Sequence, residues 1–578
     1  MPPVAPEEPP SLTTSRYRLE CAADRPYVSL SGAAGEPIAE LFVPCSVHAV
    51  DGREDTVTVG RWRRRDLGDH VLLELELGSS RWQRKVCRFR CWEERLAFEV
   101  EIEGEGRISA VDYFGGYSSA RLRWGSGFFW SRAHFAKGFN PEPTVEESYY
   151  FTPTESSLID TSGVPIAGRG GWFFTPPPFC YAFETEGGWL AMGLEAAPGE
   201  NRFNEFGYRA NRGGFCLSLP FEGTVAVAGS YRLPAIGFDF AVDEYAALER
   251  HVVSLRAQRL VKAGACERAE WWSQPIFCGW GAQGYVASKT GGGAPAQARQ
   301  ENYELFLSQL EARGLQPGTV VLDDKWQLTY GENAVDEEKW PDLAGFIADQ
   351  HRSGRKVLLW LKAWDPEGIP AEECVTNAAG EKVAVDPTNP AFEERFRESI
   401  ARMLSPEGYD ADGFKLDFTA RIPCSPGLRL ADERVWGLEL MRRYLEILHH
   451  EAKATKSDAL LMTHTPHPYL ADVVDMIRLN DINVGADVAT SMPHRACIAR
   501  LACPEAIIDT DNWPVRDKSA WRRYLEIQPE LGVSSLYFTS HIDSTGEALD
   551  EDDFELIRRT WKQAPARSET VVGVGEQV

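Results

Sequence analysis

Apolar and polar residues alternate along much of the first 240 positions of the chain. The clearest segments are 71–77, 96–102 and 224–228, where apolar side chains recur at nearly every second residue. A period of two is typical of β-strands with one buried face. Short glycine-containing turns separate these segments, and no helical stretch lies between them. We therefore predict an antiparallel β-sandwich over residues 1–240.

The period becomes helical over residues 242–258. Tyr245, Leu248 and Val252 are spaced three and four apart, which places them on one face of a helix. This spacing predicts a helix between two domains, and we assign residues 241–264 to the linker.

Strand-like and helical segments alternate after the linker. Apolar runs are followed by segments with apolar residues three and four apart, as in Phe392, Phe396 and Ile400. Eight such repeats are typical of an α/β (β/α)₈ TIM barrel, which we predict over residues 265–566, with a polar tail at 567–578. The alternative is an open doubly wound sheet, but no glycine-rich phosphate loop follows an early strand. The predicted barrel strands are 275–280, 319–324, 356–361, 413–418, 459–464, 476–481, 506–511 and 534–539.

Composition narrows the possible partners. The formal net charge of −25 disfavours nucleic acid and anionic membranes, because both require a basic surface. No apolar run is long enough to span a membrane, and the N-terminus lacks the features of a secretory signal. The 12 cysteines include no CxxC pair, which favours buried reduced thiols. We expect a cytoplasmic globular protein. The sequence leaves open whether the chain forms a homo-oligomer.

Acidic residues occur where the predicted barrel strands end. Barrel enzymes carry their chemistry at the carboxyl ends of the strands, so these side chains should converge on one mouth. Each one alone could be the N-cap of the following helix. Together they indicate either a metal site or acid/base chemistry by carboxylates. The residues are Asp323, Asp324, Asp365, Asp417, Asp481 and Asp511.

The fourth predicted strand carries the most specific pattern. Lys415 and Asp417 share one face, because side chains two apart on a strand point the same way. We expect the ammonium to favour the ionised form of Asp417. An ionised, oriented carboxylate is what a covalent nucleophile requires. The alternative is a buried structural ion pair, which would perturb the carboxyl in the same way.

A metal site is the competing interpretation. His464 and His467 follow the fifth predicted strand, and His541 with Asp543 follows the eighth. No HxH or HxxxH pair lies on a predicted strand or helix of the barrel, and divalent ions require several ligands at suitable spacing. We therefore expect no metal and no cofactor.

Three stretches of the barrel resemble known glycosidase motifs. Residues 321–327 (Val-Leu-Asp-Asp-Lys-Trp-Gln) resemble the paired-aspartate motif on strand two of the retaining α-galactosidase barrels of glycoside hydrolase families 27 and 36. Residues 339–343 and 354–360 are similar to a stretch shared with family 31. Residues 412–418, continuing to 421–423, resemble the nucleophile strand of family 31 and the Lys-x-Asp strand of family 36. The motifs follow the order of the barrel strands.

The resemblance implies a retaining exo-α-glycosidase, most similar to an α-galactosidase, that hydrolyses terminal α-linked sugars through a glycosyl-enzyme. It implies that Asp417 is the nucleophile and Asp481 the acid/base. It also implies that Lys415 contacts a sugar hydroxyl and orients Asp417, while Asp323 and Asp324 bind hydroxyls of the terminal sugar. The other expected substrate contacts are Trp280, Trp326, Trp360, Asp365, His464, Arg478 and Asp511.

The chain departs from these families in several places. Residues 463–468 replace the glycine-rich segment that follows strand five in family 36, and no acid follows Asp417 in the sequence Phe-Thr-Ala. We expect the β-domain that follows the barrel in the relatives to be missing or vestigial. The identity of the sugar and the assignment of the acid/base residue therefore stay open, and Asp511 is the alternative to Asp481 as acid/base. The alternatives are a transglycosylase, an α-glucosidase or α-xylosidase, a non-catalytic carbohydrate-binding protein and a metal-dependent barrel hydrolase.

Overall fold

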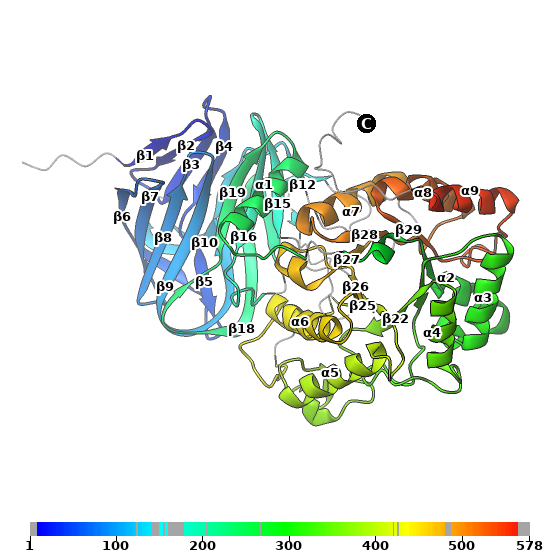
Figure 1. Ribbon diagram of the computed structural model, residues 1–578. Helices are drawn as coiled ribbons and strands as arrows, with labels where there is room; N and C mark the ends of the chain where they lie inside the picture. Colours follow the sequence, from blue (N-terminus) through cyan, green and yellow to red (C-terminus); the bar gives the residue numbers. More distant parts are fainter. Residues whose placement is uncertain are drawn as a thin grey trace, which may run out of the picture.

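The computed structural model comprises a β-rich unit and a barrel (Figure 1). It describes residues 9–563 except 123–124, 140, 142–149, 154–156, 160–178, 204, 266–267, 420, 425–426 and 480–486. The predicted polar tail at 567–578 lies outside the described residues.

The N-terminal unit is one 19-stranded sheet that is antiparallel throughout its described pairings, apart from a short parallel pairing between β6 and β10. Apolar side chains of its inner face, among them Leu73, Phe98 and Phe238, form a separate buried core. The predicted antiparallel sandwich is confirmed. The strands are β1 (Ser11–Thr13), β2 (Tyr17–Cys21), β3 (Tyr27–Gly32), β4 (Pro37–Phe42), β5 (Ser46–Ala49), β6 (Asp55–Asp66), β7 (Val71–Ser79), β8 (Arg84–Cys91), β9 (Arg95–Tyr113), β10 (Gly115–Leu122), β11 (Gly125–Ala133), β12 (Lys137–Phe139), β13 (Tyr150–Phe151), β14 (Ser157–Ile159), β15 (Cys180–Thr185), β16 (Gly188–Glu195), β17 (Gly207–Asn211), β18 (Gly214–Arg232) and β19 (Ala235–Ala241).

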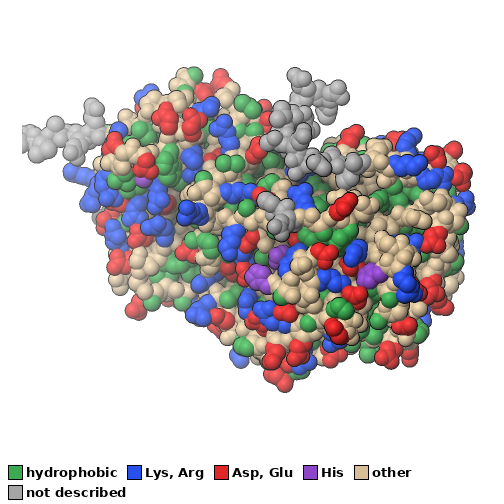
Figure 2. Space-filling view, viewed as in Figure 1, with side chains coloured by type: hydrophobic (Ala, Val, Ile, Leu, Met, Phe, Trp, Pro, Cys, Tyr) green, Lys and Arg blue, Asp and Glu red, His purple; other side chains and the backbone are tan. Residues whose placement is uncertain are grey.

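Exposed arginines gather on β6, where Figure 2 shows basic side chains over the sheet unit. Arg61, Arg63, Arg64 and Arg65 are all exposed, although the chain as a whole is acidic. Charged side chains on an outer strand oppose pairing with another chain, so these arginines protect the sheet.

The helix α1 (Glu244–Ala257) joins the two units. The Asp243 side chain caps its first turn by accepting from the backbone N–H of Ala246. Its buried residues, including Leu248 and Val252, pack against β16 and β19 on one side and α7 on the other. Arg256 also forms a bidentate ion pair with Glu505 of the barrel unit. The linker helix therefore attaches the sheet to the barrel.

The second unit is a closed barrel of eight parallel strands, which confirms the predicted fold class. Each strand pairs with its neighbour in chain order, and the last strand pairs with the first. The carboxyl ends of the strands consequently meet at one mouth. The strands are β20 (Ile276–Cys278), β21 (Thr319–Leu322), β22 (Lys356–Lys362), β25 (Gly413–Asp417), β26 (Leu460–Thr463), β27 (Met476–Arg478), β28 (Ile507–Thr510) and β29 (Val533–Leu536).

The helices differ from the predicted one-per-strand pattern in two places. Two α-helices follow β20, and β26 is followed only by a short 3₁₀ helix. Pro466 and Pro468 explain the second difference, because proline cannot donate the backbone hydrogen bond that an α-helix interior requires. The helical segments are α2 (Trp280–Thr290), α3 (Gln300–Ala312), α4 (Leu343–Arg352), α5 (Pro390–Leu404), α6 (Leu438–Thr455), α7 (Val488–Ala502), α8 (Lys518–Leu531), α9 (Glu551–Trp561), η1 (Glu270–Ser273), η2 (Ala294–Gln297), η3 (Ala371–Glu373) and η4 (Pro468–Val473). A hairpin of β23 (Cys374–Thr376) and β24 (Lys382–Val385) extends the loop after β22.

The barrel core continues into the sheet unit. Phe139, Phe179 and Trp189 of the sheet belong to the same buried cluster as the barrel strands and helices. Burying one large apolar side chain stabilises a fold by about 1.5–3 kcal/mol, so this shared core couples the two units. None of the described cysteines forms a disulfide, and all of them are buried. Among the described residues, no helix combines the length and apolar character needed to cross a membrane.

Candidate active site at the barrel mouth

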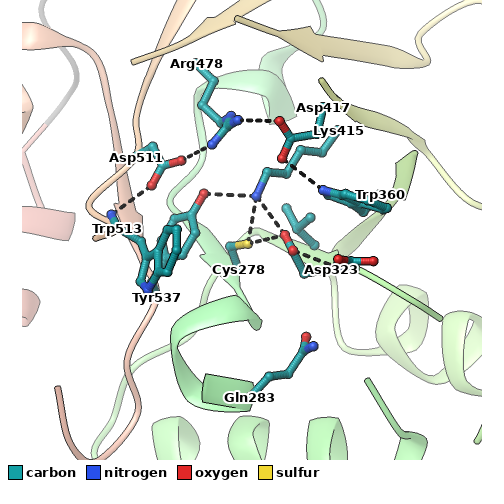
Figure 3. A network of polar contacts seen from close by, with 12 residues as sticks. Cys278, Gln283, Asp323, Trp360, Lys415, Asp417, Arg478, Asp511, Trp513 and Tyr537 are labelled. Atoms are coloured by element: carbon teal, nitrogen blue, oxygen red, sulfur yellow. Dashed lines mark hydrogen bonds and ion pairs between the residues drawn. The ribbon is translucent and has the colours of Figure 1, made fainter. Parts of the chain in front are cut away.

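Asp417 ends strand β25 and belongs to the polar network shown in Figure 3, where it contacts Arg478 and Trp360. Its Oδ1 accepts from Nη2 of Arg478 at 3.2 Å, Nε2 of His464 at 3.1 Å and its neighbour's backbone N–H at 2.9 Å. Its Oδ2 accepts from the indole N–H of Trp360 at 3.2 Å. Every one of these groups donates, so the arrangement favours a carboxylate with a full negative charge.

The pKa of Asp417 is held well below its ordinary value. Burial by itself would raise this pKa, but the charge of Arg478 and the hydrogen bond from His464 outweigh it. Lys415 contributes from a greater distance. The side chain of Asp417 is 13% exposed, more than either Arg478 or His464. An ionised carboxylate is therefore held in place at the open end of its strand.

Lys415 is on the same face of β25, but it forms its ion pair with Asp323 rather than with Asp417. Its Nζ donates to Asp323 Oδ2 at 2.7 Å and to the Tyr537 hydroxyl at 3.3 Å. The Cys278 thiol also donates to Asp323 Oδ2, at 2.9 Å. Burial opposes the charged form of Lys415, but the charge of Asp323 outweighs burial and raises the lysine's pKa. Lys415 favours the ionised form of Asp417, as expected, but Arg478 with His464 supplies most of the charge stabilisation.

Arg478 links Asp417 to a second carboxylate. Its Nη1 donates to Asp511 Oδ2 at 2.5 Å, and the other oxygen of Asp511 accepts from the backbone N–H of Trp513 at 2.9 Å. The Trp513 ring packs edge-on against Trp280, with ring centroids 5.7 Å apart. Both oxygens of Asp511 are engaged, and the residue is fully buried.

A third carboxyl group, that of Asp509, lies one layer deeper in the barrel than Asp511. Asp509 is the register partner of Arg478 on the adjacent strand and is buried. It accepts from the hydroxyl of Ser535. Burial and the charge of Asp511 raise the pKa of Asp509.

Asp324 provides a carboxyl group of the opposite character to Asp417. Burial and the nearby charge of Asp323 raise its pKa to about 6, although the Tyr330 hydroxyl donates to it at 2.8 Å and opposes that rise. The barrel therefore holds, beside Asp417 with its lowered pKa, carboxyl groups with a raised pKa in Asp324 and the deeper Asp509. Pairs of this kind are typical of acid/base sites.

Two other expected site residues have partners outside this network. Trp326 is fully buried in the core, and its indole N–H donates to the backbone carbonyl of Trp360. The Asp365 carboxylate pairs with Lys362 at 2.7 Å. Asp481, the expected acid/base, lies outside the described residues.

The residues of the metal alternative have other partners. His467 accepts from the backbone N–H of Tyr469, and burial lowers its pKa to about 3. His541 stacks on Tyr285, and Asp543 accepts from the Trp513 indole. Within residues 9–563 and outside the gaps given above, no three His, Cys, Asp or Glu side chains are grouped as metal ligands.

Comparisons with known proteins find similarity of structure only. No family model and no curated protein matches the chain. The α-N-acetylgalactosaminidase NagBb from Bifidobacterium bifidum, solved with GalNAc, matches with a TM-score of 0.61 and 13% identity, over 96% of this chain and 93% of that one. The GH31 family sulfoquinovosidase from E. rectale matches with a TM-score of 0.58 and 13% identity, over 96% and 82%. The GH36 α-galactosidase AgaB from Geobacillus stearothermophilus matches with a TM-score of 0.53 and 12% identity, over 95% of this chain and 83% of that one. The fold is that of these glycosidases, as the sequence motifs predicted.

The sequence did not single out several members of the network. Cys278 and Tyr537 both contact the Asp323–Lys415 pair, and Tyr330 contacts Asp324. Cys278 ends the first barrel strand and Tyr537 follows the last one. A search for polar side chains at all eight strand ends, rather than for acids alone, would have found both.

Proposed function

We propose that this protein is a retaining exo-α-glycosidase in which Asp417 is the nucleophile. The observation that carries the proposal is the Asp417 carboxylate, partly exposed at a strand end and held ionised by Arg478 and His464. A carboxylate in this state can attack the anomeric carbon of a bound sugar without first losing a proton.

In the proposed reaction, a C–O bond forms between Asp417 and the anomeric carbon while the glycosidic C–O bond breaks. The departing oxygen takes a proton from Asp481, and that residue then accepts a proton from the water that cleaves the glycosyl-enzyme. Two inversions retain the configuration. Asp511 is less suited to this role, because one of its oxygens binds Arg478 and the other binds a backbone N–H.

The remaining polar groups of the mouth suit a terminal sugar. The ammonium of Lys415 already donates to Asp323, Tyr537 and Cys278, whereas Asp323 and Asp324 offer acceptor oxygens to sugar hydroxyls. The α-galactosidase-like specificity implied by the sequence motifs is supported by the structural similarity to an α-galactosidase and an α-N-acetylgalactosaminidase.

The test combines a substrate panel with covalent trapping. Aryl α-glycosides of galactose, N-acetylgalactosamine, glucose and xylose would identify the sugar, and NMR of the first product would give its anomeric configuration. A 5-fluoro-α-glycosyl fluoride of the preferred sugar should label the Asp417 peptide, as read by mass spectrometry. Inversion, or labelling of another residue, would reject the proposed mechanism. Repeating the reaction with an acceptor sugar separates hydrolysis from transglycosylation.

A further inference from the structure

A row of three aromatic rings lies beside Asp417. The Tyr330 ring centroid is 5.9 Å from that of Trp360, and the Trp360 centroid is 6.3 Å from that of Phe418. Trp360 is the member that donates to Asp417 (Figure 3). The row therefore connects the ends of β22 and β25 with the loop after β21, on one side of the barrel mouth.

Three cations lie over these rings, and two of them are neutralised by carboxylates. The Nζ atoms of Lys325 and Lys362 lie 3.8 Å and 4.2 Å from the Tyr330 centroid. Lys325 pairs with Glu367 at 2.7 Å, and Lys362 pairs with Asp365 at the same distance. Each lysine thus has one acidic partner.

The third cation, Arg421, has no acidic partner among the described residues. Its guanidinium carbon lies 4.7 Å from the Phe418 centroid, and the Arg421 backbone N–H donates to the Phe418 carbonyl at 3.1 Å. The side chain is half-buried, and its Nε is buried without a hydrogen-bond partner. A buried polar atom normally has a hydrogen-bond partner, because removing such an atom from water without one is unfavourable.

Arg421 lies near the reacting centre, because its guanidinium covers the ring of Phe418, the residue that follows Asp417. Burial lowers the pKa of its guanidinium, while the negative charge of Asp417 acts in the opposite direction. Asp417 forms its own ion pair with Arg478, so it does not neutralise Arg421. The planar guanidinium of an arginine is suited to bidentate contact with a carboxylate or a sulfate group.

We propose that Arg421 binds an oxyanion on the substrate, so that the preferred substrates are acidic α-glycosides with a carboxylate or sulfate substituent. The substituent supplies to Arg421 the negative charge that Glu367 and Asp365 supply to the two lysines. This inference rests on the proposed glycosidase function, and it makes Arg421 a determinant of substrate specificity.

The first experiment measures anion binding without turnover. Inorganic sulfate is titrated into the full chain and followed by tryptophan fluorescence, with Trp360 in the aromatic row as the nearby reporter. Arg421→Gln should weaken sulfate binding at least about tenfold, and Arg421→Lys should retain part of it because it keeps a point charge. Arg434→Gln is the control, since Arg434 follows the same strand, is 81% exposed and pairs with Asp432. Equal sulfate affinity in wild type and Arg421→Gln would overturn the proposal.

The second experiment compares matched substrates. An aryl α-hexoside is compared with the same glycoside bearing a carboxylate at C6, and with one bearing a carboxylate on the aryl leaving group. Wild type should prefer at least one acidic member, and Arg421→Gln should reduce the acidic-to-neutral ratio of kcat/KM at least about tenfold. A ratio that Arg421→Gln leaves unchanged for both acidic members would reject the assignment. If no glycoside is turned over but sulfate binding still depends on Arg421, the proposed function fails and the anion site stands.

Discussion

Arg478 Nη2 donates to Asp417 Oδ1 at 3.2 Å, from a side chain that is only 2% exposed. The two residues lie on strands β27 and β25, which are separated by β26. This contact provides the largest favourable contribution to the lowered pKa of Asp417. The nucleophile is thus prepared by a residue 61 positions away in the chain.

Replacing Arg478 should therefore change how activity depends on pH. Arg478→Met removes the charge that lowers the pKa of Asp417, so the acidic limb of kcat/KM should move to higher pH. Activity near neutrality should fall about 10- to 100-fold, the equivalent of one charged hydrogen bond. Arg478→Lys, which keeps the charge, should restore part of both effects. An unchanged acidic limb in the pH–rate profile would show that Arg478 does not control Asp417.

Asp417→Gly should abolish turnover while the protein stays folded, because Asp417 ends its strand and is not part of the apolar core. Loss of the covalent step should lower kcat by several powers of ten. Circular dichroism checks the fold, and added azide should restore turnover by occupying the position of the carboxylate. The azide product should have the inverted configuration. A folded variant with near-normal kcat would exclude Asp417 as nucleophile.

Asp481→Ala should slow the cleavage of substrates with poor leaving groups far more than that of activated aryl glycosides. The reason is that only a poor leaving group needs a proton in the first step. Azide should rescue the second step by attacking the intermediate in place of water. Asp511→Ala is the matched comparison. If the dependence on the leaving group and the azide rescue appear only in Asp511→Ala, Asp511 is the acid/base.

Asp324 should make stability depend on pH in a recognisable direction. Its pKa rises from the ordinary 3.8 to about 6, so the folded state binds this proton more tightly than the unfolded chain does. The stabilising effect is complete below the unfolded pKa and is lost as the pH rises through about 6. Asp324→Asn keeps an acceptor for Tyr330 and removes the ionisation. Its free energy of unfolding relative to wild type should improve by up to about 3 kcal/mol between about pH 4 and about pH 8. Urea unfolding at both values measures this, and an equal difference at both would contradict it.

Glu439 should be important for the attachment of the sheet to the barrel. Its Oε1 on α6 accepts from the backbone N–H groups of Gly199 and Asn201 in the sheet unit, at 3.0 and 2.8 Å. The Tyr469 hydroxyl donates to the same carboxylate. Glu439→Ala should destabilise the protein by about 1–3 kcal/mol, because the backbone N–H groups of the buried Asn201 and the exposed Gly199 lose a charged acceptor. Thermal unfolding with Glu446→Ala as control would test this, and equal losses in both variants would argue against a special role.

The local sequence pattern was sufficient to predict the fold and the strand face that Lys415 and Asp417 share. The period of two in the N-terminal half predicts the sheet, and the strand–helix alternation predicts the barrel, because both periods reflect which side chains face the core. The same period places Lys415 and Asp417 on one face of β25, as observed. It also explains why acids at strand ends meet at one mouth.

Only the tertiary structure decided which of these groups contact each other. Closure of the barrel pairs β20 with β29, and this brings Cys278 and Tyr537 to the same lysine from opposite ends of the domain. Closure of the barrel also brings Lys415 into contact with Asp323 and Arg478 into contact with Asp417. The side-chain period along one strand cannot determine such contacts between strands. Trp326 shares a motif with the aspartate pair but packs into the core. Contacts across a closed sheet depend on strand register and side-chain length, and neither is encoded by local spacing.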